Sequence, residues 1–360
     1  MKVVAIGGGT GLSTLLRGLK LHVAEPGRPA RFKPYISRPT AIVTVTDEGG
    51  SSGKLRREFG IPPPGDIRNC LVALAEDEQL FTRLFNYRFS DGRGLAGHSF
   101  GNLFLAALTS LTQDFAKAVR VSSEVLAVRG EIFPSTLSDV RLEARLRDGR
   151  VVHGESRINK THVPIRRLCI VPGGCQPLPE ALAAIKAADL ITVGPGSLYT
   201  SLIPNLLVRG ISEQIARSKA LKVYIANLMT QPGETRGYTA SDHLRALHEH
   251  AGGKVFDLVI LNTGKLPAGM LRRYAAQRAG PVENDLETIR ALGVEPVLAN
   301  LLEQDHVARH DSSRLVRLLL NLASSRRAVT SHEPKRESEN RFTNVACRSK
   351  ATGRAAGLVN

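Results

Sequence analysis

The residues best suited to chemistry lie in one polar stretch, "TVTDEGGSSGKLRREFGIPPPGDIRN", which covers residues 44–69. Two adjacent acids, Asp47 and Glu48, precede a short glycine and serine loop. That loop consists of Gly49, Gly50, Ser51 and Ser52. Backbone N–H groups at the start of a helix bind phosphate oxygens, and carboxylates beside a phosphate are common ligands of Mg²⁺. The stretch is too polar for a core, so it predicts a site for a charged ligand with Asp47 and Glu48 as metal ligands.

Three further loops follow directly on short apolar runs. The first loop, after residues 3–6, contains Gly7, Gly8, Gly9, Thr10 and Gly11. The second, after residues 189–193, contains Gly194, Gly196 and Ser197, and the third, after residues 222–226, contains Asn227 and Thr230. Ligands of open parallel sheets bind beyond the carboxyl ends of the strands. The four loops are therefore expected to meet at one edge of a sheet and to bind a phosphate or diphosphate.

Several standard motifs do not fit this chain. A dehydrogenase fingerprint requires glycine where Leu12 stands, and a Walker loop requires glycine and Ser/Thr where Glu48 and Leu55 stand. The segment "GHSFG" at residues 97–101 matches a nucleophile elbow, but a loop rather than a strand precedes it, which argues against the alternative of a hydrolase. Asn102 is instead the expected N-cap of the helix that follows. His248 and His250 are two residues apart on an expected helix and cannot form a metal pair on one face.

A few side chains are candidates for the rest of the ligand. Hydrogen bonds to phosphate alone are largely offset by the cost of association, so a base or sugar must pack as well. The candidates for that packing are Tyr199, Tyr274 and Arg309. Arg56, Arg57 and Arg68 are equally well explained as phosphate ligands or as surface charge.

The elements that must position these residues alternate between apolar runs and helical stripes. Leu12, Leu15, Leu16 and Leu19 recur at helical spacing directly after the first glycine loop, and Asp66 is a candidate N-cap for a later helix. This alternation predicts an α/β fold: a Rossmann-like, mainly parallel sheet with helices on both faces.

We expect one domain over residues 1–330, with a small antiparallel β insertion at about 124–170. Its signal is the strand-like alternation around a hairpin turn at Asp148-Gly149. Residues 331–360 lack periodicity and are predicted to form a disordered basic tail.

Bulk composition narrows the class of partner. The net charge is +16, the aromatic content is 5%, and the basic residues are scattered, which favours a small anionic ligand over nucleic acid. The four cysteines form no C-x-x-C pair, and no apolar run approaches the ~20 residues of a membrane span. We therefore predict a cytoplasmic protein.

Five motifs between residues 6 and 235 resemble one family, and the similarity as a whole runs from about residue 2 to residue 323. They are "IGGGTGLSTLLRGLK", "GGSSGKLRREFGIPPPGDIRNCLVAL", "GHSFGNLFLAAL", "VGPGSLYTSLIPNLL" and "NLMTQPGET". In order and length they are similar to those of the bacterial gluconeogenesis factor family of morphogenesis proteins, which is related to 2-phospho-L-lactate transferases. The resemblance implies a Rossmann-like fold and a nucleotide-diphosphate sugar ligand of the UDP-N-acetylglucosamine type. It also implies a role in cell shape and envelope synthesis on gluconeogenic carbon sources.

The same resemblance assigns UDP-sugar binding to Tyr274 and Arg309. The family usually has two aspartates where this chain has Asp47 and Glu48. The side chain of Glu48 is one methylene longer than that of an aspartate, so its carboxylate would reach a bound Mg²⁺ from a different distance. The expected partners are the nucleotide sugar and either a second copy of the chain or a protein of envelope synthesis. Two hypotheses stay open: a UDP-sugar-binding regulator without turnover, and a Mg²⁺-dependent transferase that acts on a nucleotide-activated donor.

Overall fold

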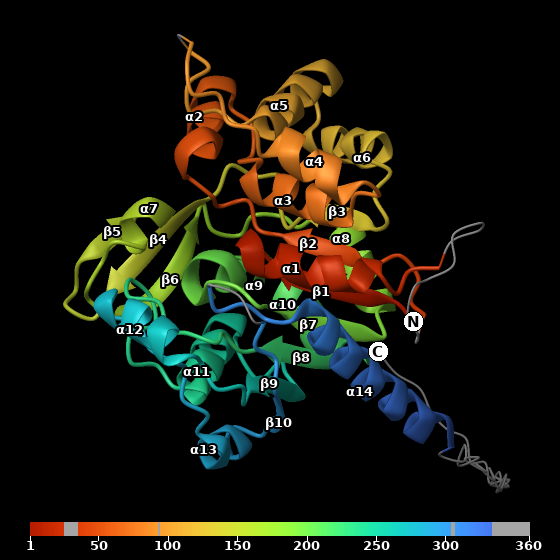
Figure 1. The fold of residues 1–360 in the computed structure, drawn as a ribbon, viewed down its shortest axis with the longest axis vertical. Helices are drawn as coiled ribbons and strands as arrows, with labels where there is room; N and C mark the ends of the chain where they lie inside the picture. The colour runs from red at the N-terminus through yellow and green to blue at the C-terminus, as the bar shows by residue number, and fades with distance from the viewer. Residues whose placement is uncertain (25–34, 93, 304–306, 333–360) are drawn as a thin grey trace, which may run out of the picture.

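A seven-stranded parallel sheet runs through the computed structural model, which describes residues 1–24, 35–92, 94–303 and 307–332 (Figure 1). The strand order is β10-β9-β8-β7-β1-β2-β3, and every neighbouring pair is parallel. The strands are β1 (Val3–Gly7), β2 (Thr40–Val43), β3 (Glu131–Pro134), β7 (Leu190–Val193), β8 (Leu221–Ile225), β9 (Leu258–Asn262) and β10 (Glu295–Ala299). The predicted α/β fold is confirmed.

Helices cover both faces of this sheet, because its strands are apolar on both sides. Along β1, Val3 and Ala5 face a core that includes α1, α3 and α14, whereas Val4 and Ile6 face a core that includes α9, α10 and α11. The helices are α1 (Gly9–Lys20), α2 (Gly50–Phe59), α3 (Gly65–Leu74), α4 (Glu78–Phe85), α5 (Phe100–Thr112), α6 (Phe115–Val125), α7 (Glu155–Ile158), α8 (Pro179–Ala187), the π-helical turn η1 (Leu198–Leu202), α9 (Ile203–Leu207), α10 (Ile211–Arg217), α11 (Ala240–Ala251), α12 (Ala268–Ala276), α13 (Leu286–Ala291) and α14 (Ser312–His332).

The leucine stripe predicted for the first helix is confirmed, since all four leucines of α1 are fully buried. Two helix starts differ from the prediction. Pro64 is the N-cap of α3, and Asp66 lies in the first turn. Ser99 is the N-cap of α5, so Asn102, the expected cap, lies inside the helix. No named strand of the structure leads into "GHSFG", which removes the geometry that a nucleophile elbow requires.

The small antiparallel sheet is present, with narrower bounds than predicted. It has the order β5-β4-β6, formed by β4 (Arg141–Leu146), β5 (Val151–His153) and β6 (Ile165–Val171). Its hairpin turns at Gly149, whose φ of 87° favours glycine. The predicted insertion at 124–170 wrongly included β3, which pairs in parallel with β2 and belongs to the main sheet.

The C-terminal helix α14 packs against α1 and extends to His332, past the predicted boundary at residue 330. The predicted disordered tail at 331–360 otherwise lies outside the described residues. None of the helices in the described ranges combines the length and hydropathy that crossing a bilayer requires.

Candidate functional site

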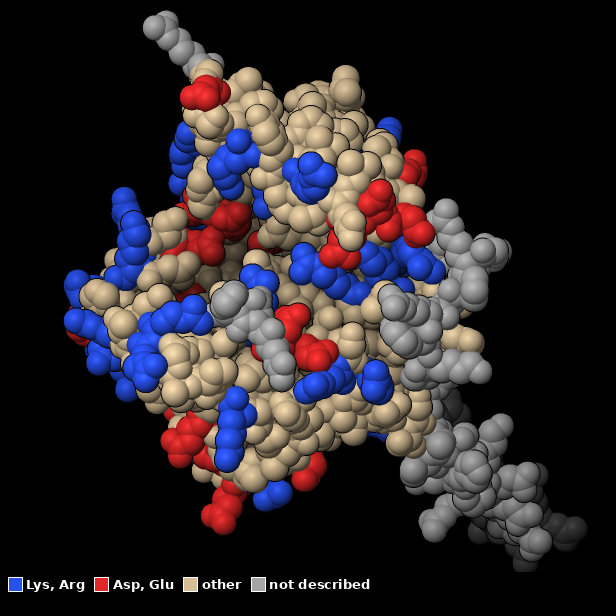
Figure 2. Space-filling model, viewed as in Figure 1, with Lys and Arg blue, Asp and Glu red and all other residues tan. Residues whose placement is uncertain are grey.

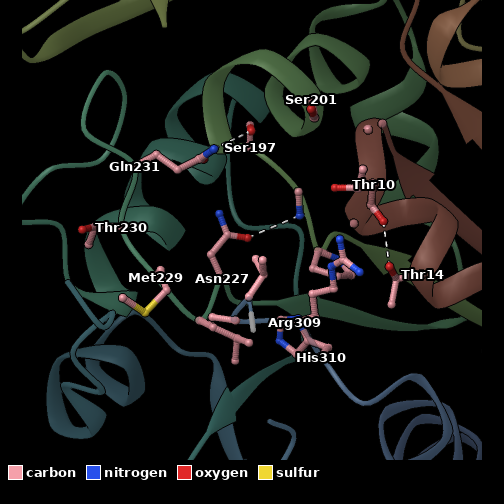
Figure 3. A pocket seen from close by; sticks show the side chains of 18 of the residues that line it. Thr10, Thr14, Ser197, Ser201, Asn227, Met229, Thr230, Gln231, Arg309 and His310 are labelled. Atoms are coloured by element: carbon pink, nitrogen blue, oxygen red, sulfur yellow. Dashed lines mark hydrogen bonds between the residues drawn. The ribbon is translucent and has the colours of Figure 1, made fainter. Parts of the chain in front are cut away.

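The main cavity lies at the carboxyl edge of the parallel sheet and has a volume of about 340 Å³ (Figure 3). Its walls are the loops after β1, β7 and β8, together with α12 and the segment 307–310. Most of the predicted ligand residues line it: Gly8, Gly9, Thr10, Gly11, Gly196, Ser197, Asn227, Thr230, Tyr274 and Arg309. The structure thus brings three of the four predicted loops to one cavity.

The amino terminus of α1 forms one wall of this cavity. The N-cap residue, Gly8, has no side chain, and the first turn of the helix contains no acid, although the Gly9 N–H donates to the carboxylate of Asp66 in α3. The first backbone N–H groups of a helix have no partner within the helix, and the helix dipole adds partial positive charge there. This wall is therefore suited to phosphate oxygens.

Glycine at position 11 lets α1 lie directly on the loop after β7. A Cβ atom there would lie 2.7 Å from the Pro195 carbonyl carbon and 3.0 Å from the Gly196 nitrogen, closer than ordinary van der Waals contact. Two predicted glycines have a different role and do not line the cavity. Gly7 ends β1 and accepts hydrogen bonds from Thr44 and Asn205, and Gly194 turns the chain at φ 92°.

Side-chain hydrogen bonds join the loops after β7 and β8. The Gly196 N–H donates to Asn227 Oδ1 over 3.3 Å, and Gln231 Nε2 donates to Ser197 Oγ over 2.8 Å. The buried carboxylate of Glu234 accepts from the Tyr199 N–H at 2.8 Å. Gln231 Oε1 has no hydrogen-bond partner within the described ranges and lies in the cavity wall. The cavity is therefore held open by bonds within the protein and retains a free acceptor.

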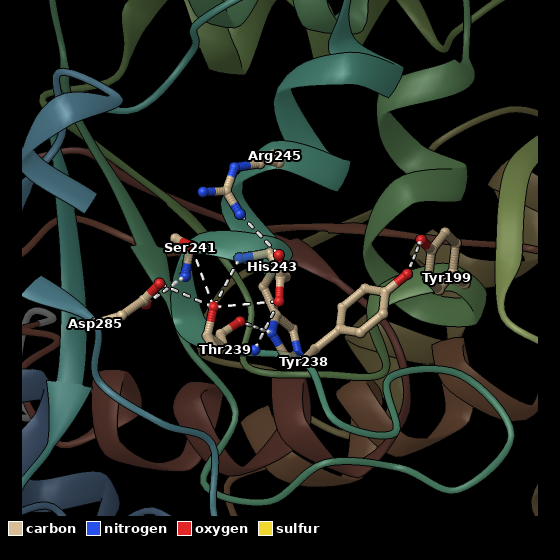
Figure 4. A network of polar contacts seen from close by, with 8 residues as sticks. Tyr199, Tyr238, Thr239, Ser241, His243, Arg245 and Asp285 are labelled. Atoms are coloured by element: carbon tan, nitrogen blue, oxygen red, sulfur yellow. Dashed lines mark hydrogen bonds and ion pairs between the residues drawn. The ribbon is translucent and has the colours of Figure 1, made fainter. Parts of the chain in front are cut away.

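Behind these loops, a polar network fixes the start of α11 (Figure 4). Thr239 and Asp242 form a capping box, and Asp285 accepts from the Ser241 N–H over 2.9 Å. Tyr199, a predicted packing residue, belongs to this network rather than to the cavity: it is buried, and its hydroxyl shares a 2.9 Å hydrogen bond with Tyr238. The candidate Tyr199 therefore packs within the protein and does not line the cavity.

The segment 307–310 brings a positive charge to the cavity. Figure 3 shows Arg309 between Asn227 and Thr14. Burial lowers the pKa of the neighbouring His310 to about 4, so His310 is neutral at pH 7. The Tyr274 hydroxyl accepts a 3.2 Å hydrogen bond from the Ala308 N–H and thereby positions this segment. Arg309 supplies the cationic group of this wall.

The fourth predicted loop lines a second cavity of about 220 Å³. Its lining residues include Asp47, Gly49, Gly50, Ser51, Ser52, Asp66, Arg68, Arg88 and Asn102. The loop lies apart because β2 follows β1 on the side opposite β7 and β8 in the strand order. Asp66 separates the two cavities, since its Oδ2 would lie 2.6 Å from a Cβ atom at Gly8. All four loops follow parallel strands at one edge of the sheet, as predicted, but this loop lines a cavity of its own.

Asp47 and Asp66 line the second cavity, and Glu155 lies near enough for its charge to interact with both. Burial, reinforced by Asp47, raises the pKa of Asp66 to about 7. Burial, together with the charges of Asp47 and Asp66, raises the pKa of Glu155 to about 8. Figure 2 shows acidic side chains in the hollow between the α2 end of the molecule and the small sheet. Negative charge is thus concentrated where a cation or a proton would stabilise it.

The predicted metal pair does not form. Asp47 lines the second cavity, whereas Glu48 lines a third one, where its carboxylate lies against Gly154 and 3.9 Å from Arg56. Within the part of the chain that the structure describes, no group of three or more His, Cys, Asp or Glu residues is arranged to hold a metal ion. Mg²⁺ usually takes one or two carboxylates and completes its shell with water and substrate phosphates. Asp47 and Asp66 fit that donor set, and Glu48 does not.

Two histidines of α11, His248 and His250, and the arginine at position 56, which were considered in the sequence analysis, have structural roles. His250 Nε2 accepts from the Leu168 N–H over 2.9 Å, and His248 stacks on Phe256, so these histidines do not form a site. Arg56 is buried and donates to Asp139 and to the Val140 carbonyl.

Comparison with known proteins agrees with this architecture. A family model described as the 2-phospho-L-lactate transferase CofD matches residues 3–302. The chain belongs to this family. Among CofD-family proteins, it is 48% identical to the gluconeogenesis factor of Bacillus subtilis over 322 residues, which are 89% of this chain and 98% of that protein. The family resemblance inferred from the five motifs is confirmed.

Two further relatives support the assignment. A putative gluconeogenesis factor of Nostoc sp. is 53% identical over 322 residues, covering 89% of this chain and 68% of that protein. The crystal structure of a UPF0052 family protein from Bacillus halodurans superposes with a TM-score of 0.83 at 47% identity, covering 89% of this chain and 98% of that one.

Proposed function

We propose that this CofD-family chain binds a nucleotide-diphosphate sugar of the UDP-N-acetylglucosamine type in the main cavity. The diphosphate lies at the amino terminus of α1, and Arg309 faces it from the opposite wall. The observation that carries the proposal is that the glycine-rich start of α1 and Arg309 line the same cavity. Charge-assisted hydrogen bonds from arginine and from helix N–H groups are the usual ligands of diphosphates.

An adjoining cavity gives room for the remainder of such a ligand. It has a volume of about 460 Å³ and shares Asn227 and Leu228 with the main cavity. Its other lining residues include the apolar Leu266, Leu271, Pro281 and Val282 and the amides Asn262 and Asn284. Apolar walls with a few amides suit a planar base, so a diphosphate in the main cavity could extend a base into this one.

The cellular role we propose is that of a regulator. The similarity to gluconeogenesis factors supports a link to growth on gluconeogenic carbon sources, and the proposed ligand is a precursor of envelope polymers. The liganded protein would act in the cytoplasm on cell shape and envelope synthesis, through self-association or a protein partner.

The binding test compares the wild-type protein with Arg309→Ala by isothermal titration with UDP-N-acetylglucosamine. Loss of a charge-assisted hydrogen bond of about 1.5–3 kcal/mol predicts an affinity at least ~10-fold lower. Arg272→Ala is the matched control, because Arg272 is an exposed arginine of α12 that does not line the cavity. Equal affinity of the wild type and Arg309→Ala would remove Arg309 from the site.

The second candidate function is a transferase, favoured by the position of the second cavity. Asp66 lies beside Gly8, and Asp47, Arg68 and Arg88 line the same cavity as Asp66. There Asp47 and Asp66 would hold Mg²⁺, which would neutralise charge on the diphosphate of a nucleotide-activated donor. Incubation with Mg²⁺ and a panel of such donors separates the two functions: intact ligand supports the regulator, and nucleotide release supports the transferase.

A further inference from the structure

The cavity lined by Glu48 has a volume of about 460 Å³ and shares no lining residue with the main cavity, the second cavity or the adjoining cavity. Three arginines from three elements line it: Arg57 of α2, Arg141 of β4 and Arg157 of α7. Buried Leu142 and Gly154 also line it. Figure 2 shows basic side chains on the side of the molecule that carries β5 and α7. We call this feature the arginine cavity.

The charge of the arginine cavity is not balanced by the protein. None of the three guanidinium groups forms an ion pair or a side-chain hydrogen bond with any residue that the structure describes. Neighbouring arginines differ: Arg145 lies 3.7 Å from Glu143, and Arg150 lies 2.7 Å from Asp148. Within the described part of the chain, the three arginines of the cavity therefore lack the carboxylate partners that Arg145 and Arg150 have.

Glu48 is the one acidic residue among those that line the cavity, and its carboxylate is already engaged. It lies 3.9 Å from the buried Arg56 and fills the space that a side chain at Gly154 would need. His153, also in the wall, lies 3.7 Å from Glu143. The three arginines thus leave a net positive charge around an open space, to which an anion of two or more charges is attracted.

We propose that the arginine cavity binds a small polyanion, a phosphate ester or a polycarboxylate, at a site separate from the nucleotide cavity. Guanidinium forks match phosphate and carboxylate oxygens bidentately, and three of them from separate elements converge on one ligand. Such an anion joins α2 to the small antiparallel sheet. The inference does not rest on the proposed nucleotide-sugar function.

The site is linked to the second cavity through the backbone. Glu155, two residues before Arg157, accepts a 3.2 Å hydrogen bond from the Glu48 N–H, and Glu48 follows Asp47 directly. An anion that orders Arg157 therefore acts on the segment that positions Asp47. Any coupling between the two cavities is reciprocal, so each ligand changes the affinity of the other by the same factor.

The experiment uses the full chain in isothermal titration with citrate and fructose 1,6-bisphosphate, with fructose as a neutral control and NaCl at matched ionic strength. We expect at least one of the two anions to bind and fructose not to bind. Citrate alone would identify a polycarboxylate site, and the bisphosphate alone would identify a phosphate site. If neither anion binds, the proposal is wrong.

Variants separate this cavity from the nucleotide cavity. In the double variant Arg141→Gln/Arg157→Gln, anion affinity falls at least tenfold while UDP-N-acetylglucosamine binding is kept as in the wild type. The matched control is Arg145→Gln/Arg150→Gln, which changes two paired arginines of the same hairpin and keeps anion binding. Circular dichroism verifies the fold of both. Anion binding that survives in the first double variant, or that disappears in Arg309→Ala, would place the anion elsewhere and overturn the proposal.

Discussion

The contact between α1 and the loop after β7 gives a sharp test of how the main cavity is built. In Gly11→Ala, the new Cβ atom would lie 2.7 Å from the Pro195 carbonyl carbon and 3.0 Å from the Gly196 nitrogen, and closer still to the Pro195 oxygen. Ordinary contacts of a Cβ atom begin at 3.4 Å. Because every clashing atom belongs to the backbone, no side chain can rotate away. The start of α1 and the loop must separate instead.

The cost of such overpacking is about 1–3 kcal/mol. We expect Gly11→Ala to lower the melting temperature by a few degrees, at roughly 2–4 °C per kcal/mol or less for a chain of this size. The separation also moves the α1 amino terminus away from Arg309, so affinity for UDP-N-acetylglucosamine falls at least ~10-fold if one charge-assisted hydrogen bond is lost.

Differential scanning fluorimetry and isothermal titration measure the two effects. Gly269→Ala is the control, because Gly269 lies in helix α12 and a Cβ atom there meets nothing within 4 Å. A helical glycine replaced by alanine is neutral or stabilising by up to about 1 kcal/mol. If Gly11→Ala melts and binds like the wild type, α1 does not rest on this loop and the proposed cavity is incorrect.

Four further predictions address other parts of the molecule. Asn205→Ala removes the hydrogen bonds from the buried Nδ2 to the Gly7 and Ser201 carbonyls and should lower the free energy of unfolding by about 2–3 kcal/mol in urea titrations; an unchanged midpoint would contradict it. The pKa of Asp66 is about 7 in the folded protein and 3.8 in the unfolded chain. Protonated Asp66 therefore stabilises the fold at low pH, and this stabilisation is lost as the pH rises from about 4 through 7. Between pH 5 and pH 8, the free energy of unfolding of Asp66→Asn should therefore rise by roughly 3 kcal/mol relative to that of the wild type. If the two free energies change in parallel with pH, the pKa of Asp66 is not raised. Arg309→Ala weakens nucleotide-sugar binding at least ~10-fold, with Arg272→Ala as control. The double variant Arg141→Gln/Arg157→Gln loses anion binding at the arginine cavity, whereas Arg145→Gln/Arg150→Gln retains it.

Local patterns of apolar and turn residues were sufficient to predict several helices and strands of the fold. The spacing of Leu12, Leu15, Leu16 and Leu19 predicted a buried helical stripe, and all four are buried in α1. The alternation around Asp148-Gly149 predicted the hairpin between β4 and β5. Such signals succeed because periodicity is set by backbone geometry within a few residues. They failed for β3, since a four-residue strand beside an insertion carries no sign of which sheet it joins.

Side-chain direction at the site was less predictable. Asp47 and Glu48 are adjacent in sequence, yet they line different cavities, because Glu48 fills the space beside Gly154 and faces Arg56. Asp66 was expected to cap a helix and instead lies against Gly8. A capping acid and a buried site acid look alike in sequence, since both follow a turn and precede an apolar stripe.

The class of fold, the glycine loops at the strand ends and the family could be predicted from the sequence, because each of these depends on residues that are close along the chain. The division of the loops among separate cavities could not be predicted in this way. That division follows from strand order, which places β2 on one side of β1 and β7 and β8 on the other. Strand order is a property of long-range packing, and no local spacing of residues encodes the distance between two strand ends.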